Sequence, residues 1–397
     1  MAESATVSAP ARWDARQWQL LIVLSGNMIL DAIEVSIVLP ALPTTAAQLH
    51  LSTWTAQWLM SGFALGFAAL LVPGRGLVAR YGRRRVYLGA MAVFAVASVL
   101  GGTSSSIGVL IATRVVKGGA AALTAPAGLA VIAAEFRDGA PQQRAVSIYA
   151  LFGAAGFTAG LLLSGALTAV DWHLVFVFPA PVAAALLLLG WRVFPDSPTG
   201  PTPQVPIALL RNRSLMLTAV GAATLNAGYI CLLLVVTLQV RAGLGWSAAQ
   251  TAFALLPACL PLTLSTPYAA RLASRFGPTN LILGGAVAAA SAELLWLMEP
   301  SVRSYLIPVL PVLVLVEFGF VLSFAALNMR ATAAVTAAER ASAVPLYQTA
   351  VQLGAALSLP IVVALATVSA RIAAAAIAVT GLAGVGAALL AQRKVLP

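Results

Sequence analysis

Apolar stretches of about 20 residues or more, separated by short polar connections, follow one another along almost the whole chain. A helix of about 20 apolar residues is long enough to cross the hydrocarbon core of a bilayer, which is about 30 Å thick. The pattern predicts an all-α integral membrane protein with little sequence left for a soluble domain. The twelve spanning helices are expected at about 19–43, 54–73, 86–105, 108–130, 145–170, 173–194, 214–240, 247–270, 279–298, 305–327, 341–367 and 369–391.

A short sequence motif recurs half a chain apart. Residues 77–82 read LVARYG and residues 272–277 read LASRFG, an offset of 272 − 77 = 195 residues. The repeat predicts two pseudo-symmetric six-helix bundles, at 18–194 and 213–397. Paired membrane bundles around a central site are the architecture of alternating-access transporters. A gene duplication without transport is the alternative interpretation.

Two segments outside the bundles lack a membrane-spanning pattern. The stretch FPDSPTGPTPQVP, at 194–206, contains five prolines and no helical pattern. We therefore interpret residues 195–212 as a cytoplasmic linker between the bundles. Residues 1–17 are rich in Ala and Ser and are expected to form a cytoplasmic N-terminal lead.

The composition excludes a soluble protein. Hydrophobic residues make up 60% of the chain, charged residues only 9%, and the mean hydropathy is +0.95. In soluble proteins roughly a quarter of the residues are charged. Cys231 and Cys259 both lie inside apolar runs, which argues against a disulfide framework or a cysteine metal site. We expect neither a cofactor nor a metal.

The positions of the basic residues predict the orientation of the chain in the membrane. With the N-terminus placed in the cytoplasm, most of the 23 Lys and Arg residues fall in cytoplasmic segments, and the outside segments hold only Arg241, Arg303 and Arg371. This asymmetry follows the positive-inside rule. It predicts a multi-pass protein of the cytoplasmic (inner) membrane with both termini cytoplasmic, and it explains the net charge of +11 without nucleic-acid binding.

Four charged residues lie within the predicted membrane helices of the first half. Asp31 and Glu34 lie on the first helix, and Arg114 and Lys117 lie on the fourth. If the two helices run in opposite directions, Glu34 and Arg114 are each roughly 10 Å below the outer surface. Asp31 and Lys117 are level with each other at roughly 14 Å. The spacing predicts two ion pairs, Glu34 with Arg114 and Asp31 with Lys117.

Ionisable groups in a bilayer are costly unless they are paired or hydrated, so such a cluster calls for an explanation. In the functional interpretation, the carboxylates bind protons or a charged substrate in turn beside the fixed bases. In the structural interpretation, a permanent salt-bridge cluster holds the two helices together. We favour function, because small residues could join the same helices without charges.

The second half contains fewer candidates. Glu317, in the tenth helix, has no base at comparable depth, so it could carry a proton or meet a cationic substrate; a protonated core residue is the alternative. Glu293, in the ninth helix, lies nearer the outer surface and is a weaker candidate. The uncharged residues that could line a cavity, although helix packing explains such residues equally well, are Asn226, Tyr229, Gln348 and Gln352.

The fifth helix carries small residues four positions apart. Such spacing allows a neighbouring backbone to approach closely and would suit a sliding or hinging surface, but it is also a common packing motif. The residues concerned are Gly156, Gly160, Ser164 and Gly165.

Taken together, these segments resemble the major facilitator superfamily, and within it the drug:proton antiporters. LDAIEVSIVLP places Asp31 at the aspartate of the family's first helix, and ATRVVKGGAAA places Arg114 at the arginine implicated in proton coupling. GFTAGLLLSG resembles the antiporter signature of the fifth helix. The loop between the second and third helices resembles the family's gating loop at Arg80, Gly82, Arg83 and Arg84.

The chain also departs from the family pattern. The loop aspartate is replaced by Ala79, and by Ser274 in the repeat. In the fifth helix, Leu161 stands where the family has proline. In the first and fourth helices, Glu34 replaces an apolar residue and Lys117 replaces a glutamine. These last two changes are of opposite charge and predicted to lie close together, as expected of a compensated pair.

The resemblance implies a monomeric secondary transporter, not an enzyme, that exports a drug, antibiotic or secondary metabolite by alternating access in exchange for protons. The expected cavity lies between the bundles near the midplane, with the four charged residues on one wall and Glu317 on the other. A proton-independent uniporter or importer of a small polar metabolite on the same fold is one alternative. A membrane enzyme or sensor is another, disfavoured because the only histidines are His50 and His173 and no nucleophile, metal or nucleotide motif is present.

Overall fold

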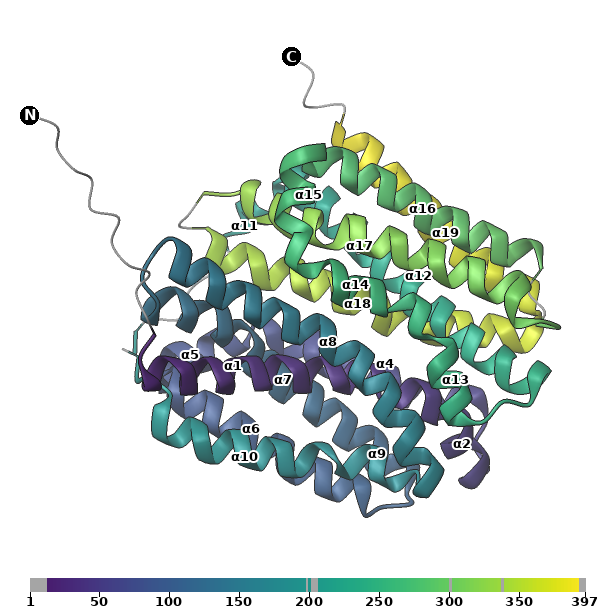
Figure 1. The fold of residues 1–397 in the computed structure, drawn as a ribbon, viewed down its shortest axis with the longest axis horizontal. Coiled ribbons are helices and arrows are strands. Elements are labelled where there is room, and N and C mark those ends of the chain that lie inside the picture. Colours follow the sequence, from purple (N-terminus) through teal and green to yellow (C-terminus); the bar gives the residue numbers. More distant parts are fainter. Residues whose placement is uncertain (1–12, 198, 201–205, 300–301, 337–338, 393–397) are drawn as a thin grey trace, which may run out of the picture.

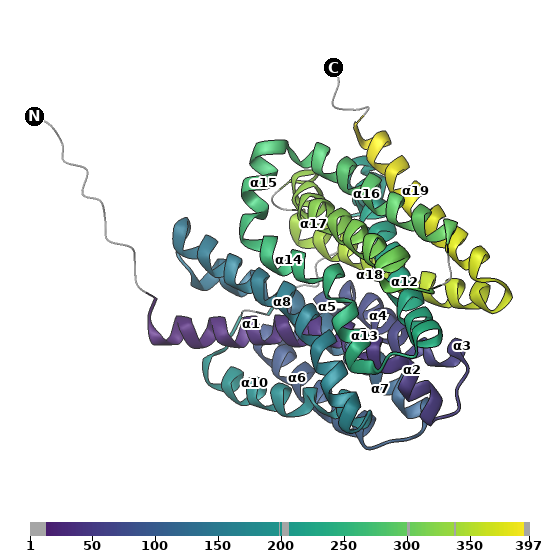
Figure 2. The ribbon, with the colours of Figure 1, turned by 45° about the vertical axis from the view of Figure 1, so that its right-hand side comes forward.

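The computed structural model describes residues 13–392 except 198, 201–205, 300–301 and 337–338. All regular elements of the described residues are helical, as predicted. The helices form two bundles that lie side by side (Figure 1). One end of the molecule carries α5 and α15, and the opposite end carries α2 and α13 (Figures 1 and 2); we call these the α5 end and the α2 end.

In the described residues, the N-terminal bundle contains six helices of 14 residues or more and four shorter ones. Its elements are α1 (Ala15–Ser36), α2 (Val38–Gln48), α3 (Thr53–Ala56), α4 (Trp58–Leu71), α5 (Gly74–Tyr81), α6 (Arg83–Gly102), α7 (Ile107–Glu135), α8 (Ala140–Val170), α9 (His173–Val177) and α10 (Pro179–Val193).

The C-terminal bundle follows a short helix in the linker. The elements are α11 (Ile207–Arg211), α12 (Arg213–Leu244), α13 (Ala248–Ala254), η1 (Leu256–Ala258), α14 (Leu260–Ser265), η2 (Thr266–Tyr268), α15 (Ala269–Phe276), α16 (Pro278–Met298), η3 (Tyr305–Val309), α17 (Leu310–Ala333), α18 (Arg340–Val368) and α19 (Ala370–Gln392). Helix α11 lies within residues 195–212, a linker for which no helix was predicted.

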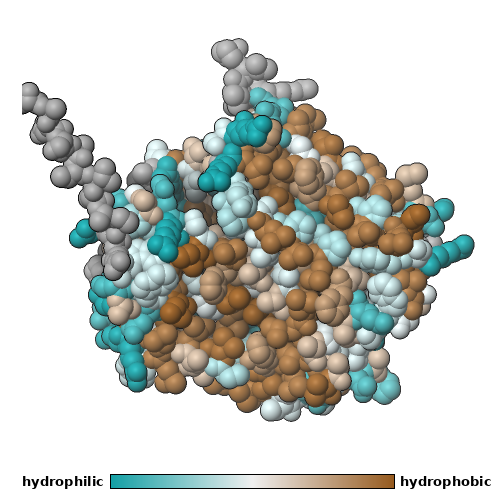
Figure 3. Space-filling view, in the orientation of Figure 1, coloured by the Kyte–Doolittle hydropathy of each residue, from teal (hydrophilic) through white to brown (hydrophobic). Residues whose placement is uncertain are grey.

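Eleven helical segments of the described chain are long and apolar enough to cross a membrane, at the positions of eleven of the twelve predicted spans. In Figure 3, hydrophilic residues gather at the two ends of the visible face, and the surface between them is largely hydrophobic.

The prediction of a continuous eighth helix at 247–270 is wrong. This segment is divided into α13, η1, α14, η2 and the start of α15, and Pro257, Pro261 and Pro267 each remove one backbone hydrogen-bond donor from it.

The first helix starts earlier than predicted and ends sooner. Asp14 caps α1 by accepting the Gln17 N–H, and the Gln17 side chain accepts the Asp14 N–H in return. The helix therefore begins inside the predicted lead 1–17, of which residues 1–12 lie outside the described residues. At the other end, the predicted helix 19–43 is divided at Ile37 into α1 and α2.

Structural landmarks confirm that the two bundles are related. Ser52 caps α3 and Ser247 caps α13, each by accepting the N–H three residues ahead. Gly82 ends α5 with φ of 82°, and Gly277 ends α15 with φ of 76°. A residue with a side chain rarely adopts such a positive φ. Both pairs are separated by 247 − 52 = 277 − 82 = 195 residues, the offset of the sequence repeat.

The two bundles meet along α4 with α18, and along α8 with α13 and α14. At the α5 end, Arg75 Nη2 donates to Ser342 Oγ at 2.9 Å. Towards the α2 end, Arg241 Nη2 donates to Thr44 Oγ1 at 3.2 Å. Polar contacts therefore join the bundles at both ends of the molecule.

Candidate functional site

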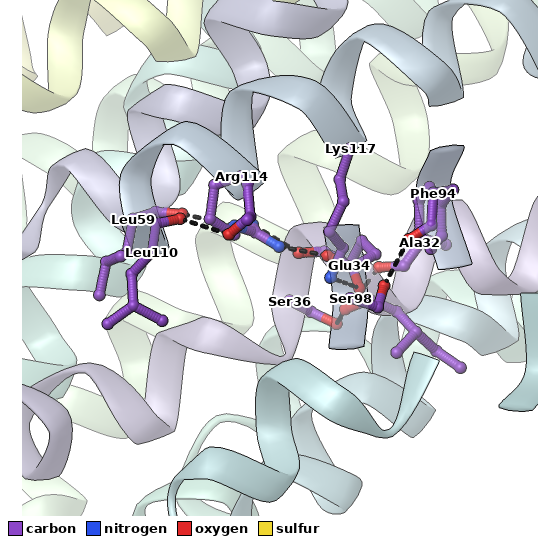
Figure 4. A network of polar contacts seen from close by, with 11 residues as sticks. Ala32, Glu34, Ser36, Leu59, Phe94, Ser98, Leu110, Arg114 and Lys117 are labelled. Carbon is purple, nitrogen blue, oxygen red and sulfur yellow. Dashed lines mark hydrogen bonds and ion pairs between the residues drawn. The ribbon is translucent and has the colours of Figure 1, made fainter. Parts of the chain in front are cut away.

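Three of the four predicted charged residues form one buried ion cluster (Figure 4). Glu34, on α1, lies between Arg114 and Lys117 of α7 and forms an ion pair with each; its Oε1 lies 2.5 Å from Lys117 Nζ. The exposed fractions of these side chains are 0% for Glu34, 1% for Arg114 and 2% for Lys117. The predicted Glu34–Arg114 pair is confirmed.

Backbone oxygens and aromatic rings complete the cluster around the two bases. Arg114 Nη2 donates to the Glu34 carbonyl oxygen at 2.9 Å, and Arg114 Nε donates to the Leu59 carbonyl oxygen of α4 at 2.7 Å. The Arg114 guanidinium lies 4.8 Å from the Phe63 ring centroid, and Lys117 Nζ lies 5.3 Å from that of Phe94. Aromatic faces attract cations, so the surroundings compensate part of the excess positive charge.

The predicted ion pair between Asp31 and Lys117 is wrong. Asp31 accepts a hydrogen bond of 2.9 Å from Asn27 Nδ2, one turn earlier on α1, and forms no ion pair within the described chain. The two helices do lie side by side with their charged residues at similar depths. The long Lys117 side chain, however, reaches the Glu34 carboxylate, which also pairs with Arg114. The shorter Asp31 side chain meets its neighbour at i − 4, which shares its face of the helix.

Asp31 lies in a polar surrounding built by three further helices. The hydroxyls of Tyr87, from α6, and Tyr149, from α8, lie near its carboxyl group. The Tyr87 hydroxyl is buried without a hydrogen-bond partner in the described chain, and that of Tyr149 donates to the Ala125 carbonyl oxygen of α7 at 3.3 Å. Asp31 is thus the one member of the predicted quartet with no charged partner among the described residues.

The four residues lie inside the N-terminal bundle. Their hydrogen-bond, ion-pair and cation–π partners among the described residues come from α1, α4, α6 and α7. Their lining of a cavity between the bundles therefore stays a prediction.

The small residues of α8 have two different partners. A Cβ added at Gly156 would lie 2.7 Å from the Ile29 carbonyl oxygen of α1, and one at Gly160 would lie 2.8 Å from that of Ile33. A Cβ at Gly165 would instead lie 2.9 Å from Ala249 Cα of α13, in the other bundle. The close approach expected from the sequence is thus present, and it joins α8 both to the acid-bearing helix and to the second half.

Glu317, on α17, is fully buried and has no basic partner among the described residues, as predicted. Its Oε1 accepts the Leu262 N–H of α14 at 2.7 Å, and its Oε2 has no hydrogen-bond partner in the described chain. The Tyr229 hydroxyl lies beside this carboxyl and donates to the Ala258 carbonyl oxygen. Glu317 therefore contacts the broken eighth segment rather than an ionic partner.

The uncharged candidates make contacts within the C-terminal bundle. Asn226 Nδ2 donates to the Val351 carbonyl oxygen at 2.9 Å, which joins α12 to α18. Gln348 Nε2 donates to Asn328 Oδ1 at 3.3 Å, and Gln352 is half-buried. Together with the Tyr229 contact above, these bonds agree with the packing interpretation. Their lining of a cavity stays a prediction.

The arginines of the α5 end mainly contact their own half. The Arg83 N–H donates to Ser197 Oγ at 2.8 Å, and Arg84 Nη2 donates to the Trp191 carbonyl oxygen at 2.6 Å. The Arg80 guanidinium lies over the Tyr81 ring. These contacts connect the loop to α10 and the linker, so a gating role for Arg80, Gly82, Arg83 and Arg84 stays a prediction.

Comparison with known proteins decides the family. Residues 24–359 match the family described as the Major Facilitator Superfamily. The chain belongs to this superfamily. The crystal structure of a bacterial homolog of the human lysosomal transporter Spinster, in an inward-facing and occupied conformation, superposes with a TM-score of 0.74 at 16% identity, over 96% of this chain and 98% of that one. This likeness supports the major facilitator fold.

Several relatives of this Major Facilitator Superfamily protein are named for resistance or export. The puromycin resistance protein of Streptomyces alboniger is 30% identical over 89% of this chain and 82% of its own length. The multidrug efflux pump LfrA of Mycolicibacterium smegmatis is 34% identical, over 53% and 42%. The cephamycin export protein CmcT of Amycolatopsis lactamdurans is 31% identical, over 51% and 43%. The chain spans less than half the length of these last two relatives.

Membership establishes the class of function. The chain is a multi-pass membrane transporter of small molecules and not an enzyme. Two features of this Major Facilitator Superfamily chain were missed by the sequence reasoning: the contact of Arg75, at the α5 end, with the other half, and the depth of burial of Glu293, which is 1% exposed. The basic loop and the apolar run of α16 were the available signals, but neither distinguishes one arginine or one acid from its neighbours.

Glu293 fills a gap between three helices. A Cβ added at Gly228 of α12 or at Gly381 of α19 would collide with its carboxylate oxygens. The side chain also lines a cavity of about 20 Å³, together with Thr224 and Thr380. Such a volume holds about one water molecule. Glu293 is therefore accommodated by the absence of side chains on its neighbours.

Proposed function

We propose that this transporter exports a small organic compound, such as a drug, antibiotic or secondary metabolite, across the cytoplasmic membrane by alternating access in exchange for protons. The relatives named for puromycin, cephamycin and multidrug export support the substrate class. The α5 end, which carries Arg75, Arg80, Arg83, Arg84 and Arg85, faces the cytoplasm by the positive-inside rule. The transporter acts as a monomer, with both termini in the cytoplasm.

The observation that carries the proton coupling is the difference between the two acids of α1. Glu34 holds two bases, and losing its charge would leave both of them unpaired in a buried site. Asp31 forms no ion pair within the described chain and accepts only the Asn27 hydrogen bond, so it can take up and release a proton without breaking a salt bridge. Asp31 is the proton carrier, and Glu34 is the fixed counter-charge of Arg114 and Lys117.

Protonation of Asp31 changes the charge balance between α1 and α7. With both acids ionised, the two negative charges offset Arg114 and Lys117; with Asp31 protonated, one positive charge remains uncompensated. In a buried site this difference is weakly screened and alters the attraction between the helices. Helix α1 can shift in response, because at Gly156 and Gly160 no side chain of α8 stands between the two helices.

The test is substrate-driven proton movement in liposomes that contain the purified protein and an internal pH dye. With puromycin, a tetracycline or a cationic dye as substrate, the wild-type protein should move protons against the substrate flux. Asp31→Asn should reduce this proton movement at least tenfold, while downhill substrate flux persists. Asp138→Asn, a matched change of an exposed acid between α7 and α8, should behave as the wild type. Substrate transport without proton movement in the wild type, or full coupling in Asp31→Asn, would contradict the proposal.

A further inference from the structure

The break in the eighth membrane segment separates one specific pair of backbone groups. In a continuous helix, the Leu262 N–H would donate to the carbonyl oxygen four residues earlier, that of Ala258. Here the chain turns away at Cys259, whose φ is −145° and ψ is −31°. The Ala258 carbonyl oxygen accepts the Tyr229 hydroxyl, and the Leu262 N–H donates to Glu317 Oε1 at 2.7 Å. Two side chains thus replace a single helical hydrogen bond.

We propose that Glu317 is a second proton-binding site, and that its protonation allows the Leu262 N–H to return to the Ala258 carbonyl oxygen and close the break. Ionised Glu317 holds the N–H through a charge-assisted hydrogen bond, which is roughly twice as strong as a neutral one. The neutral carboxylic acid is a weaker acceptor, and the helical bond then competes with it. Proton uptake therefore makes the segment continuous through residue 262.

The geometry leaves room for the proton at one oxygen of the carboxyl. Glu317 Oε2 is buried and has no hydrogen-bond partner in the described chain, so it can carry the proton while Oε1 contacts α14. Backbone groups left without helical partners in a membrane segment are tolerated only where other protein groups satisfy them. The side chains of Tyr229 and Glu317 serve this purpose in the broken state.

Within the part of the chain that the structure describes, no basic side chain faces Glu317 from the elements packed against α17. The titratable groups near it are Tyr229 of α12 and Cys259, between η1 and α14. The only charged side chain of α16 is Glu293, which points towards α12 and α19, and the only one of α18 is Arg340, its first residue. The charged residues of α12 lie near its two ends, and η1 and α14 contain none. Protonation of Glu317 therefore removes the main charge of this region.

The broken segment also contacts the other half of the transporter. Thr263 Oγ1, on α14, donates to the Ala154 carbonyl oxygen of α8 at 3.1 Å and lies 3.1 Å from Thr158 Oγ1. Closing the break moves Thr263 relative to α8, because Thr263 directly follows the residue whose hydrogen bond changes. The state of Glu317 is therefore transmitted to the interface between the bundles. The use of this switch during export rests on the proposed function, but the switch itself requires no substrate.

The experiment measures the shape of the segment by spin labels at Gln250 and Arg275, two exposed positions on α13 and α15, after both native cysteines are replaced by alanine. These positions would be roughly 38 Å apart in a straight helix. In nanodiscs, the wild-type distance distribution should lengthen as the pH is lowered. Glu317→Gln, a neutral acceptor of similar shape, should increase the ratio of closed to broken segments roughly five- to tenfold at high pH.

Three variants make the outcome decisive. Glu293→Gln is the matched control, an equal change of a neighbouring buried acid that does not contact the break, and it should titrate as the wild type. Tyr229→Phe frees the Ala258 carbonyl oxygen and should shift the transition to higher pH. Asp31→Asn should reduce proton exchange in liposomes at least tenfold yet retain the pH-dependent lengthening of the distance, which separates this proposal from the transport mechanism. A wild-type distance that does not depend on pH, or a Glu317→Gln distance equal to the wild type, overturns the proposal.

Discussion

The two halves of the protein accommodate acidic side chains buried within the membrane in different ways. In the N-terminal bundle, Glu34 is matched by two long basic side chains from a neighbouring helix. In the C-terminal bundle, Glu317 is held by a backbone N–H, and Glu293 occupies the space left by two glycines. Both halves retain the same capping serines and positive-φ glycines at an offset of 195 residues. A shared fold therefore constrains the turns far more than the interior charges.

This difference indicates which of the buried acids can be protonated at low cost. Neutralising Glu34 would leave two buried cations without a partner, which is costly. Neutralising Asp31, Glu293 or Glu317 leaves no unpaired cation among the described residues, so these acids can change charge at lower cost. The first two predictions below test how the acids of the two halves are held, and the third tests a contact between the halves.

The largest effect is expected for Glu34→Gln. Breaking a buried ion pair by removing one partner costs roughly 3–5 kcal/mol, because the remaining charge is uncompensated. Thermal unfolding in detergent should show a loss of this size for Glu34→Gln. The double variant Glu34→Gln/Lys117→Met should recover part of the loss, since it removes one unpaired cation. A Glu34→Gln protein within about 1 kcal/mol of wild type would mean that Glu34 is not the counter-charge.

An intermediate effect is expected for Gly228→Ala. The added Cβ would meet only side-chain atoms, chiefly the Glu293 carboxyl, and such overpacking costs roughly 1–3 kcal/mol. Glu293→Ala in the same chain should remove most of this penalty, as measured by a double-mutant cycle of unfolding free energies. Gly381→Ala should not be rescued in this way, because its Cβ would also lie 2.8 Å from Ala290 Cα of the α16 backbone. Equal rescue of both glycine variants would show that the carboxyl does not fill this gap.

The smallest effect is expected for Ser342→Ala, which removes the hydrogen bond from Arg75 between the halves. Such a bond contributes about 1 kcal/mol, or roughly a fivefold change in an equilibrium. The fraction of molecules open at the α5 end, measured by spin-label distances between α5 and α18, should increase by about this factor. Ser274→Ala is the matched control, because the Ser274 hydroxyl only donates to the Arg271 carbonyl oxygen of its own helix. An unchanged distribution in Ser342→Ala would assign the contact no role in holding this end closed.

Hydropathy was sufficient to predict eleven of the membrane helices, because each apolar run is long and no other structure satisfies its backbone in a bilayer. The broken eighth segment could not be predicted in the same way. Prolines are tolerated in membrane helices, and α18 continues through both Pro345 and Pro360. Whether the chain breaks depends on partners such as Tyr229 and Glu317, which lie far away in the sequence.

The charged cluster shows a similar limit. Helix rise fixes the depth of each residue, so the Glu34–Arg114 pair could be predicted from counting alone. Depth says nothing about rotation around the helix axis or about the reach of a side chain. Lys117 therefore joined Glu34 rather than Asp31. For the same reason, the sequence could not show that the cluster lies within one bundle. Packing between many small residues decides which helices face the other bundle.

Helix α8 is a rod of about 46 Å that lies against both acid systems. It supports α1 through Gly156 and Gly160, and its Ala154 and Thr158 meet Thr263 of α14. Two binding equilibria that bias the same rigid body influence each other reciprocally, whichever of them is perturbed first. The titrations proposed for Asp31 and Glu317 are accordingly coupled, and a substitution at either acid should displace the midpoint of the other by the same amount.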